Sequence, residues 1–389
     1  MRVLIALTYY RPHTSGLTIY AERMARSLAS RGHAVTVLTS RFDPTLPLRE
    51  ERDGVQVIRV PVAFRISKGV VMPTFGLVAT RLARRHDVLS LHLPQLDASG
   101  LALRGRLFGR PVVVTYHCDL TLPDTPLNRL VNPVVVWSDR ATGALADVVV
   151  AYTDDYARHS RFLSRLLPKV RVISPPVEVE SPRPEEVDAF RARWNPAGSP
   201  LVGMAARLAT EKGVEVLLRA LPLVREKVPG VRVLYAGQHE DVLGEAAYRE
   251  RLRPLLERED GLWTFLGVLP QRDMALFFSA VDVLVVPSLN STESFGLVQV
   301  EAMLRGTPSV ASALPGVRQP VRMTGMGEVF ATGDAGALAD ALVRVLTNRP
   351  AYVRPVEEIE ALFSSARTAE RYEELFEELL ARRRPGAAP

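Results

Sequence analysis

Residues 287–306 read PSLNSTESFGLVQVEAMLRG, and the apolar run VLVV at 283–286 comes directly before them. An apolar run, a polar loop and an amphipathic segment in this order predict a buried strand followed by a helix over 296–305. Strand, loop and helix in succession are the repeating unit of an α/β fold, so this stretch sets the pattern with which the rest of the chain is compared.

Two carboxylates and three backbone amides make this stretch a candidate site. Glu293 and Glu301 stand eight positions apart, just over two helical turns, so a helix that began at Glu293 would carry both on one face. Gly296 permits close backbone approach, and the amides of Phe295, Gly296 and Leu297 would offer N–H groups to an anion. Such a loop suits a ligand with both phosphates and hydroxyls, whereas a solvated helix face is the simpler alternative.

Short apolar runs alternate with helical patterns along the whole chain. Unbroken apolar strands between helices predict parallel sheets that are covered on both faces. The expected strands are 3–7, 34–38, 55–60, 88–91, 111–116, 147–151, 170–173, 201–205, 231–237, 263–266, 283–286 and 309–311. The expected helices include 18–31, 213–228, 244–258, 271–280, 296–305, 335–347 and 366–384.

The fold class that follows is α/β, with two tandem doubly wound Rossmann-like domains, because 389 residues are too many for one ordinary domain. We expect a first domain over 1–177, a linker with a short helix over 178–199 and a second domain over 200–355. A C-terminal helix within 356–389 would pack back towards the first domain. Ligands bind beyond the carboxyl ends of such strands, so we expect the site in a cleft between the domains.

Charge is distributed unevenly between the two halves. Residues 1–175 hold 24 Lys and Arg against 13 Asp and Glu, whereas the remainder holds 25 against 30. A basic first half suggests an anionic partner. We expect no nucleic acid, because no nucleic-acid module is recognisable. The segment 64–86 mixes apolar and basic residues and hints at docking on an anionic membrane, with a core helix that has a basic end as the alternative.

The location expected from the sequence is cytoplasmic, with a peripheral position on the inner face of the membrane as the alternative. The single cysteine, Cys118, excludes an internal disulfide and fits a reducing compartment. No apolar run is long enough to span a bilayer. The first residues, MRVLIALTYYRP, read as a buried strand and not as a signal peptide.

Five ordered stretches carry a resemblance to a known family. They are SGLTIYAERMARSLASRGHAVTVLT (15–39), VVVTYHCD (112–119), GMAARLATEKGVEVLLRAL (203–221), GVLPQRDMALFFSAVDVLVVPS (267–288) and ESFGLVQVEAMLRGTPSVAS (293–312). Together they resemble glycosyltransferases of the GT-B fold in the large retaining family 4, whose domain is called glycosyl transferases group 1. The resemblance covers almost the whole chain.

The resemblance implies roles for the residues of the second half. Glu293 would contact the hydroxyls of the donor sugar and Glu301 those of the ribose, both as acceptor carboxylates. Leu269 would lie where the family holds the base. Arg207 and Lys212 follow the strand 201–205 and could converge on the donor diphosphate, Arg as a fork and Lys as a point charge. Two solvated cations at a helix start are the alternative.

In the first half, the resemblance singles out Gly16 and His117. Gly16 is the one glycine of the loop 8–16, where a doubly wound domain presents amides to a phosphate, and no G-x-G-x-x-G fingerprint occurs there. His117 ends the strand 111–116 and would contact the donor sugar near the reacting carbon, while a satisfied structural histidine is the alternative. His92, which ends another strand, is expected to be structural.

The function implied is transfer of a sugar from a UDP- or GDP-sugar to a saccharide or lipid-linked acceptor, with retention of configuration. No Asp-x-Asp pair occurs, so we expect no metal and no cofactor, with the leaving diphosphate neutralised by cations and amides. Alternatives are a sugar-nucleotide epimerase or another GT-B enzyme such as a glycan phosphorylase, and a non-catalytic sugar-nucleotide-binding subunit.

Overall fold

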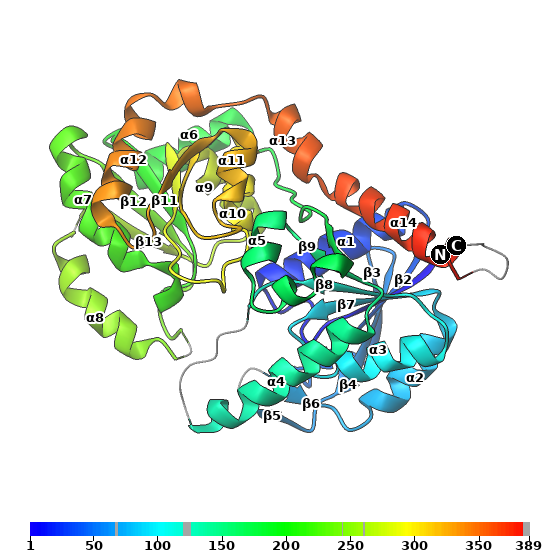
Figure 1. Cartoon of the computed structure of the whole chain (residues 1–389). Helices are drawn as coiled ribbons and strands as arrows, with labels where there is room; N and C mark the ends of the chain where they lie inside the picture. Colours follow the sequence, from blue (N-terminus) through cyan, green and yellow to red (C-terminus); the bar gives the residue numbers. More distant parts are fainter. Residues whose placement is uncertain (67–68, 120–125, 243, 260, 384–389) are drawn as a thin grey trace. The chain divides into compact units, whose positions relative to one another are not determined.

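The computed structural model describes residues 1–66, 69–119, 126–242, 244–259 and 261–383. The chain forms two compact units, the first made of Met1–Pro176 with Phe363–Pro389 and the second of Val177–Leu362. Each unit has its own, mainly parallel sheet with helices around it (Figure 1), so the expected α/β pattern occurs twice.

The described part of the first unit contains an eight-stranded sheet in the order β10-β9-β8-β7-β1-β2-β4-β3. Its strands pair in parallel except β3, which runs antiparallel to β4. The strands of this sheet are β1 (Arg2–Ala6), β2 (Ala34–Arg41), β3 (Arg49–Arg52), β4 (Val55–Pro61), β7 (Val88–Leu93), β8 (Val112–Tyr116), β9 (Val148–Ala151) and β10 (Val170–Val172). The helices are α1 (Gly16–Ser30), α2 (Phe75–Arg85), α3 (Ala98–Leu107), α4 (Pro126–Leu145), α5 (Asp154–His159) and α14 (Ser365–Ala381). In a separate two-stranded sheet, β5 (Phe64–Ile66) pairs antiparallel with β6 (Gly69–Val71).

The second unit contains a parallel six-stranded sheet in the order β13-β12-β11-β14-β15-β16 within the described residues. Its strands are β11 (Leu201–Ala205), β12 (Arg232–Ala236), β13 (Trp263–Gly267), β14 (Val283–Val286), β15 (Ser309–Ser312) and β16 (Gly327–Phe330). Its helices are α6 (Pro184–Trp194), α7 (Val214–Lys227), α8 (Ala246–Glu257), α9 (Gln271–Ala280), α10 (Leu297–Met303), α11 (Gln319–Thr324), α12 (Ala335–Thr347) and α13 (Val356–Phe363), the last of which ends at the boundary.

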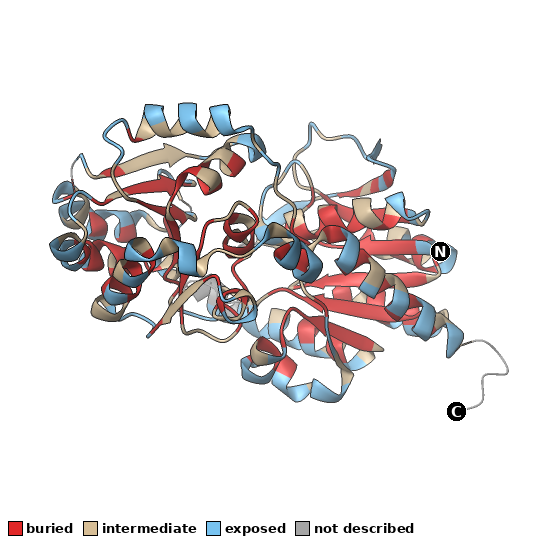
Figure 2. Cartoon of the chain, turned by 90° about the horizontal axis from the view of Figure 1, so that it is seen from above, coloured by how far each residue is buried: buried red, intermediate tan, exposed pale blue. Residues whose placement is uncertain are grey.

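Burial explains why both sheets form. All residues of β14 and β9 and all but the first residue of β1 are buried, because helices cover both faces of the sheet. Figure 2 shows buried strands flanked by helices whose outer sides are exposed. No helix within the described ranges is both long and apolar enough to cross a bilayer.

The structure confirms the twelve expected strands within one to three residues at each end, and helices α9 and α12 have the predicted bounds. Helix α10 begins one residue later than the expected 296–305, because Gly296 adopts a left-handed conformation and is its N-cap, and it ends at Met303, two residues early. The short strands β3, β5, β6 and β16 were not predicted. Residues 178–199, expected as a linker, lie in the second unit, where α6 packs on α9 and Arg191 pairs with Asp282 at 2.6 Å. Helix α14 belongs to the first unit and packs on α1.

Candidate functional site

Two loops of the second unit are locked together at the carboxyl ends of neighbouring strands β11 and β14. Gly213, at the end of the β11–α7 loop, has a φ of 67°, and a Cβ atom there would lie 2.1 Å from the carbonyl oxygen of Pro287. The amide of Leu289 donates to the carbonyl oxygen of Glu211 at 2.9 Å. Only glycine permits this approach, so the loop with Arg207 and Lys212 is fixed against the loop with Glu293.

Lys212 and Glu293 form an ion pair across these two loops. The Nζ atom of Lys212 lies 2.6 Å from Oε2 of Glu293, and each side chain is 21% exposed. The other oxygen of Glu293, Oε1, accepts from the amide of Gly296 at 3.0 Å. The carboxylate is thereby held at the amino end of α10. A carboxylate has about four acceptor positions, so Glu293 retains acceptor capacity for the hydroxyls of a ligand.

Arg207 lies on the same loop as Lys212, but its side chain is half exposed. Its Nη2 atom donates to Oε1 of Glu211 at 3.1 Å. An exposed pair of this kind contributes little to stability and can be exchanged for a stronger acceptor. Arg207 is therefore able to turn towards an anion while Lys212 stays beside Glu293.

The turn into α10 is rigid because a buried glutamine braces it. Gln299 is fully buried, and its amide group donates to the carbonyl oxygens of Phe295 at 3.1 Å and Val317 at 2.9 Å. Phe295 is also buried, whereas Leu297 and Glu301 are half buried on α10. Of the three amides predicted to bind an anion, that of Gly296 is engaged by Glu293.

Leu269 lies two residues after β13 and is half buried. The strand before it carries Phe265, whose ring stacks on His239 with centroids 4.3 Å apart. The amide of Gly237 donates to the carbonyl oxygen of Gly267 at 2.7 Å, which ties the ends of β12 and β13 together. The neighbourhood of Leu269 therefore offers flat and apolar side chains at the same edge of the sheet.

In the first unit, His117 is buried and both of its ring nitrogens have protein partners. Its Nε2 atom lies 2.8 Å from Nδ1 of His92, and its Nδ1 atom is hydrogen-bonded to the hydroxyl of Tyr152. The ring of Tyr20 is nearly perpendicular to the imidazole, with the two ring centroids 5.0 Å apart. Burial, with the neighbouring imidazole of His92, lowers the pKa of His117 well below its ordinary value. This geometry agrees with a neutral, structural histidine, which was the alternative interpretation.

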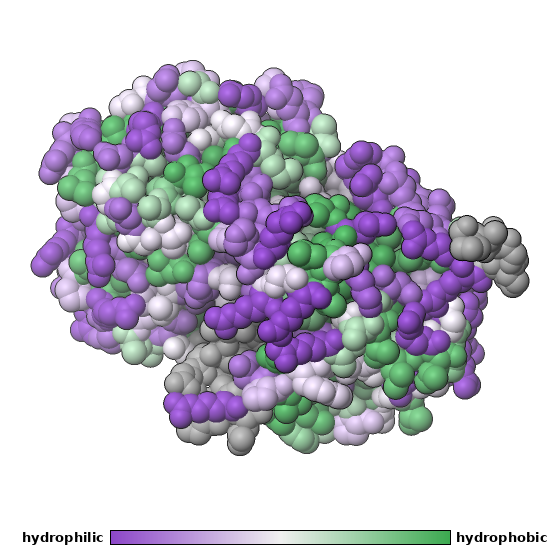
Figure 3. All heavy atoms as spheres, in the orientation of Figure 1, coloured by the Kyte–Doolittle hydropathy of each residue, from purple (hydrophilic) through white to green (hydrophobic). Residues whose placement is uncertain are grey.

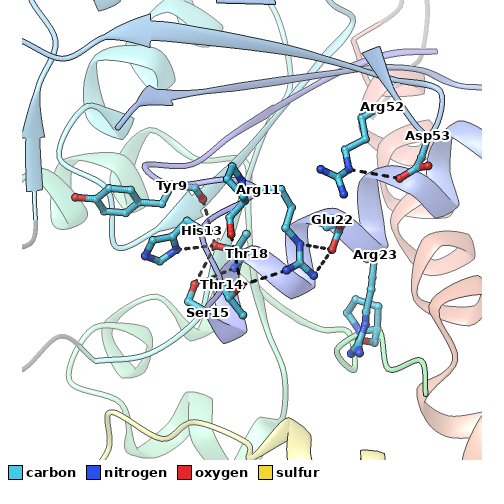
Figure 4. Close-up of polar contacts among 12 residues, drawn as sticks. Tyr9, Arg11, His13, Thr14, Ser15, Thr18, Glu22, Arg23, Arg52 and Asp53 are labelled. Atoms are coloured by element: carbon cyan, nitrogen blue, oxygen red, sulfur yellow. Dashed lines mark hydrogen bonds and ion pairs between the residues drawn. The ribbon is translucent and has the colours of Figure 1, made fainter. Parts of the chain in front are cut away.

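Gly16 is the exposed first residue of α1, after a loop that is ordered by its own side chains (Figure 4). The Oγ atom of Ser15 accepts from the amide of Thr18 at 3.2 Å and caps the helix. The ring of His13 stacks on that of Tyr9 with centroids 4.8 Å apart. The loop therefore presents the amino end of α1 to solvent, as a phosphate-binding loop requires.

The structure brings Lys212 and Glu293 into contact, places Arg207 on the loop of Lys212, and places Leu297 and Glu301 on α10. Sequence reasoning missed Gly213 and Gln299, which position these residues. Only the glycine had a signal, its place between a loop and a helix. Within the described ranges, no three His, Cys, Asp or Glu side chains are grouped to hold a metal ion.

Comparisons with known proteins agree with both units. Residues 15–176 match the family model described as "Glycosyl transferase 4-like domain", and residues 199–348 match "Glycosyl transferases group 1". The chain is 31% identical to a D-inositol 3-phosphate glycosyltransferase of Saccharomonospora viridis, over 94% of this chain and 90% of that protein. It is 29% identical to a phosphatidyl-myo-inositol mannosyltransferase of Mycobacterium leprae, over 90% of this chain and 88% of the relative.

A solved structure shares the fold. The crystal structure of Anabaena Alr3699/HepE in complex with UDP superposes with a TM-score of 0.77 at 19% identity, over 97% of this chain and 100% of that one. The two mainly parallel sheets and this likeness confirm the predicted GT-B fold class. With both family models matched and a relative above 30% identity along nearly the whole chain, this protein belongs to the group 1 glycosyl transferases and is a hexosyltransferase-type glycosyltransferase.

Proposed function

We propose that this glycosyltransferase moves a hexosyl group from a nucleoside diphosphate sugar, a UDP- or GDP-sugar, to a saccharide or lipid-linked acceptor, with retention of configuration and without a metal ion. The observation that carries the proposal is the pair of Lys212 and Glu293, held where two loops meet at the carboxyl edge of the second sheet. A cation beside a carboxylate matches a donor that carries phosphates next to hydroxyls.

Each residue has a distinct part in the proposed donor site. Lys212 and Arg207 neutralise the departing diphosphate, and the amides at the start of α10 add further N–H groups. Glu293 accepts hydrogen bonds from sugar hydroxyls at the carboxylate positions that the amide of Gly296 does not occupy. Glu301 accepts hydrogen bonds from the ribose hydroxyls. Leu269 supports the base. Placing charge where the leaving group develops it lowers the barrier without a covalent role for the protein.

The first unit is proposed to bind the acceptor. Gly16 would approach a phosphate of the donor through its backbone. Because both ring nitrogens of His117 are engaged, we propose that His117 acts near the reacting carbon mainly by fixing the end of β8, and that a direct contact requires it to exchange Tyr152 or His92. The two relatives described above are named for inositol-containing acceptors, so phosphorylated inositols belong among the compounds tested.

A lipid-linked acceptor requires access to a membrane surface. Helices α2 and α3 expose large apolar side chains, Leu77 at 77% and Leu107 at 70%, and on the face drawn in Figure 3 hydrophobic groups gather in the region of these helices. Arg81, Arg84 and Arg106 lie on the same two helices. Apolar and basic side chains together suit reversible docking on an anionic bilayer. Sedimentation with anionic and neutral vesicles, at low and high salt, tests the docking, and binding that ignores lipid charge would reject it.

The donor is identified by a thermal-shift screen of UDP-, GDP-, ADP- and TDP-sugars, because a ligand that binds the folded state raises the melting temperature by mass action. Incubation of the best donor, labelled in the sugar, with saccharide, inositol phosphate and lipid-linked acceptors then defines the reaction. A glycoside with the anomeric configuration of the donor supports the proposal. An epimerised sugar nucleotide or a sugar phosphate as the product would replace it with one of the other GT-B reactions.

A further inference from the structure

A groove of about 670 Å³ opens in the first unit at the amino ends of the strands. Residues of α2 line one side of it, and residues of β2, β4 and β3 line the other. The loop 8–16 and His117 follow the carboxyl ends of β1 and β8, so the groove is at the opposite edge of the same sheet. It is therefore separate from the proposed glycosyl-transfer site.

Strand pairing shows how the floor of the groove is built. Antiparallel β3 adds a strand beyond β4, with Arg49 opposite Ile58 and Glu51 opposite Gln56. On β4, Gln56 and Ile58 alternate with the buried Val55 and Val57. Directly paired residues of two strands lie on the same face, so Arg49 and Glu51 share that face, and all four residues line the groove. From the helix, Val78 and Leu82 line the other side. One part of the groove is therefore apolar and the other part is polar.

Guanidinium groups dominate the rim. Arg2, Arg49, Arg81 and Arg85 line the groove, with Glu51 as the one carboxylate among the lining residues. Arg2 is occupied by Asp87, at 2.6 Å. The side chains of Arg49, Arg81 and Arg85 have no hydrogen bond or ion pair with any residue that the structure describes. Arg81 and Arg85 are also four positions apart on α2, a spacing at which like charges repel and destabilise a helix.

A buried histidine fixes the base of the groove without adding charge. His86 is 8% exposed, its Nδ1 atom lies 2.8 Å from the carbonyl oxygen of Leu82 and its Nε2 atom lies 2.9 Å from Oγ1 of Thr36. Both ring nitrogens therefore have partners, and the end of α2 is tied to β2. Burial also lowers the pKa of His86, which keeps the ring neutral. The positive charge of the groove thus comes from its arginines.

We infer that this groove binds a small molecule that carries one or more phosphate groups. Arg49, Arg81 and Arg85 bind the phosphate oxygens, because a guanidinium matches them with two parallel N–H groups. The uncharged remainder of the ligand packs on Ile58, Val78 and Leu82. The volume is within the range of small-molecule sites, about 300–1,000 Å³. A free phosphate ester and the headgroup of a phospholipid share this chemistry.

Calorimetric titration of the full chain with inorganic pyrophosphate tests the inference. The proposed donor site can bind pyrophosphate as well, so the readout is the number of equivalents bound by each variant. We expect the double variant Arg81→Gln/Arg85→Gln to lose one equivalent, or to bind it at least tenfold more weakly. Gln56→Trp, at an exposed position on the floor, should have the same effect, because it fills the groove without changing the charge.

The control is Arg219→Gln/Arg258→Gln, which removes the same charge from exposed residues of the second unit that do not line the groove. It should bind as the parent does. Vesicles of phosphatidylglycerol in phosphatidylcholine distinguish the sources of phosphate. Pyrophosphate binding that depends on the groove indicates a free ligand, and vesicle binding alone, lost in both groove variants, indicates a headgroup. The inference is wrong if neither probe binds, or if the groove variants bind both probes as the control does.

Discussion

The ammonium group of Lys212 lies 2.6 Å from the carboxylate of Glu293, and this contact joins the loop after β11 to the loop after β14. The two side chains are only 21% exposed, so each charge depends on the other more than it would in water. A donor diphosphate placed next to Lys212 would share that cation with Glu293. The same pair can therefore hold a phosphate on one side and a sugar hydroxyl on the other.

Replacing Lys212 by Ala, or Glu293 by Gln, is expected to lower kcat/KM at least 100-fold, about 3 kcal/mol of transition-state stabilisation. The double variant should lose less than the sum of the two, because the residues act as a unit. Lys227→Ala removes a surface lysine paired with Asp340 in the same unit and should keep parental rates. Full activity of Glu293→Gln would reject the site assignment.

Gly213→Ala tests whether the contact between the two loops positions the pair. The new Cβ would lie 2.1 Å from the carbonyl oxygen of Pro287, on a backbone with a φ of 67°. We expect a loss of about 2–4 kcal/mol in the free energy of unfolding of the second unit, together with a lower kcat/KM.

Gly230→Ala is the matched control for that variant. Gly230 has a φ of 76°, and its nearest neighbour is Oγ of Ser199 at 3.9 Å, so only the backbone cost of about 1 kcal/mol applies. Urea unfolding and steady-state kinetics on both variants separate strain from positioning. Equal behaviour of the two variants would show that the loop contact has no role in the site.

The sequence predicts the strands of this fold well and its contacts poorly. Buried parallel strands such as β14 are continuous apolar runs, and their hydrophobicity alone identifies them. Strand β3 reads REER and is largely exposed, so no apolar pattern marks it. Strand β16 begins at Gly327, where a Cβ would lie 1.8 Å from the carbonyl oxygen of Ser309, and glycine in a strand reads as a break.

In the candidate site, too, the sequence predicts local features better than contacts between distant residues. The resemblance to a known family was enough to propose Lys212 and Glu293, since the motifs that carry it are local in the chain. The partners of His117 come from other strands, His92 from β7 and Tyr152 from the end of β9, and no local pattern reports that they meet. Contacts between distant segments depend on the packing of the sheet, which periodicity does not specify.

Chelation with EDTA is expected to leave kcat and KM unchanged. In the proposed mechanism, Arg207 and Lys212 neutralise the departing diphosphate, so no divalent cation has to do so. The measurement is initial rate with the identified donor, after dialysis against EDTA and again after addition of Mg²⁺ or Mn²⁺. A fall of more than tenfold that either ion restores would contradict metal independence.

Tyr372→Phe is expected to loosen α14 from the first unit. The Tyr372 hydroxyl lies 2.8 Å from that of Tyr20 on α1 and 2.7 Å from Oγ1 of Thr115 on β8, and the residue is fully buried. Its removal leaves two buried hydroxyls short of a partner, at a cost of about 1–3 kcal/mol. Hydrogen exchange of α14 amides should accelerate accordingly. Tyr352→Phe, which removes a partly exposed hydroxyl in the second unit, should leave α14 unchanged.

The buried imidazoles of His92 and His117 make the stability of the first unit dependent on pH. Burial lowers the pKa of His92 from 6.5 to about 3 and lowers that of His117 as well. Below pH 6.5 the unfolded chain binds protons at these side chains and the folded chain does not, so unfolding becomes more favourable as the pH falls. Each imidazole contributes a slope of up to about 1.4 kcal/mol per pH unit, and for His92 the loss continues to about pH 3.

Other buried groups oppose this trend, so a variant is needed to isolate it. Burial raises the pKa of Asp139 to about 7, and this carboxylate therefore stabilises the folded state as the pH falls. His92→Asn keeps an acceptor for His117 but cannot be protonated. Between pH 6.5 and 4, it should reduce the pH dependence of the free energy of unfolding by the contribution of about one bound proton. His159→Asn, at an exposed position on α5, is the same substitution as a control. Hydrogen exchange of β7 and β8 amides, corrected for the intrinsic rate at each pH, measures the slope. If His92→Asn keeps the parental slope, the two imidazoles are not the neutral, buried pair that their hydrogen bond implies.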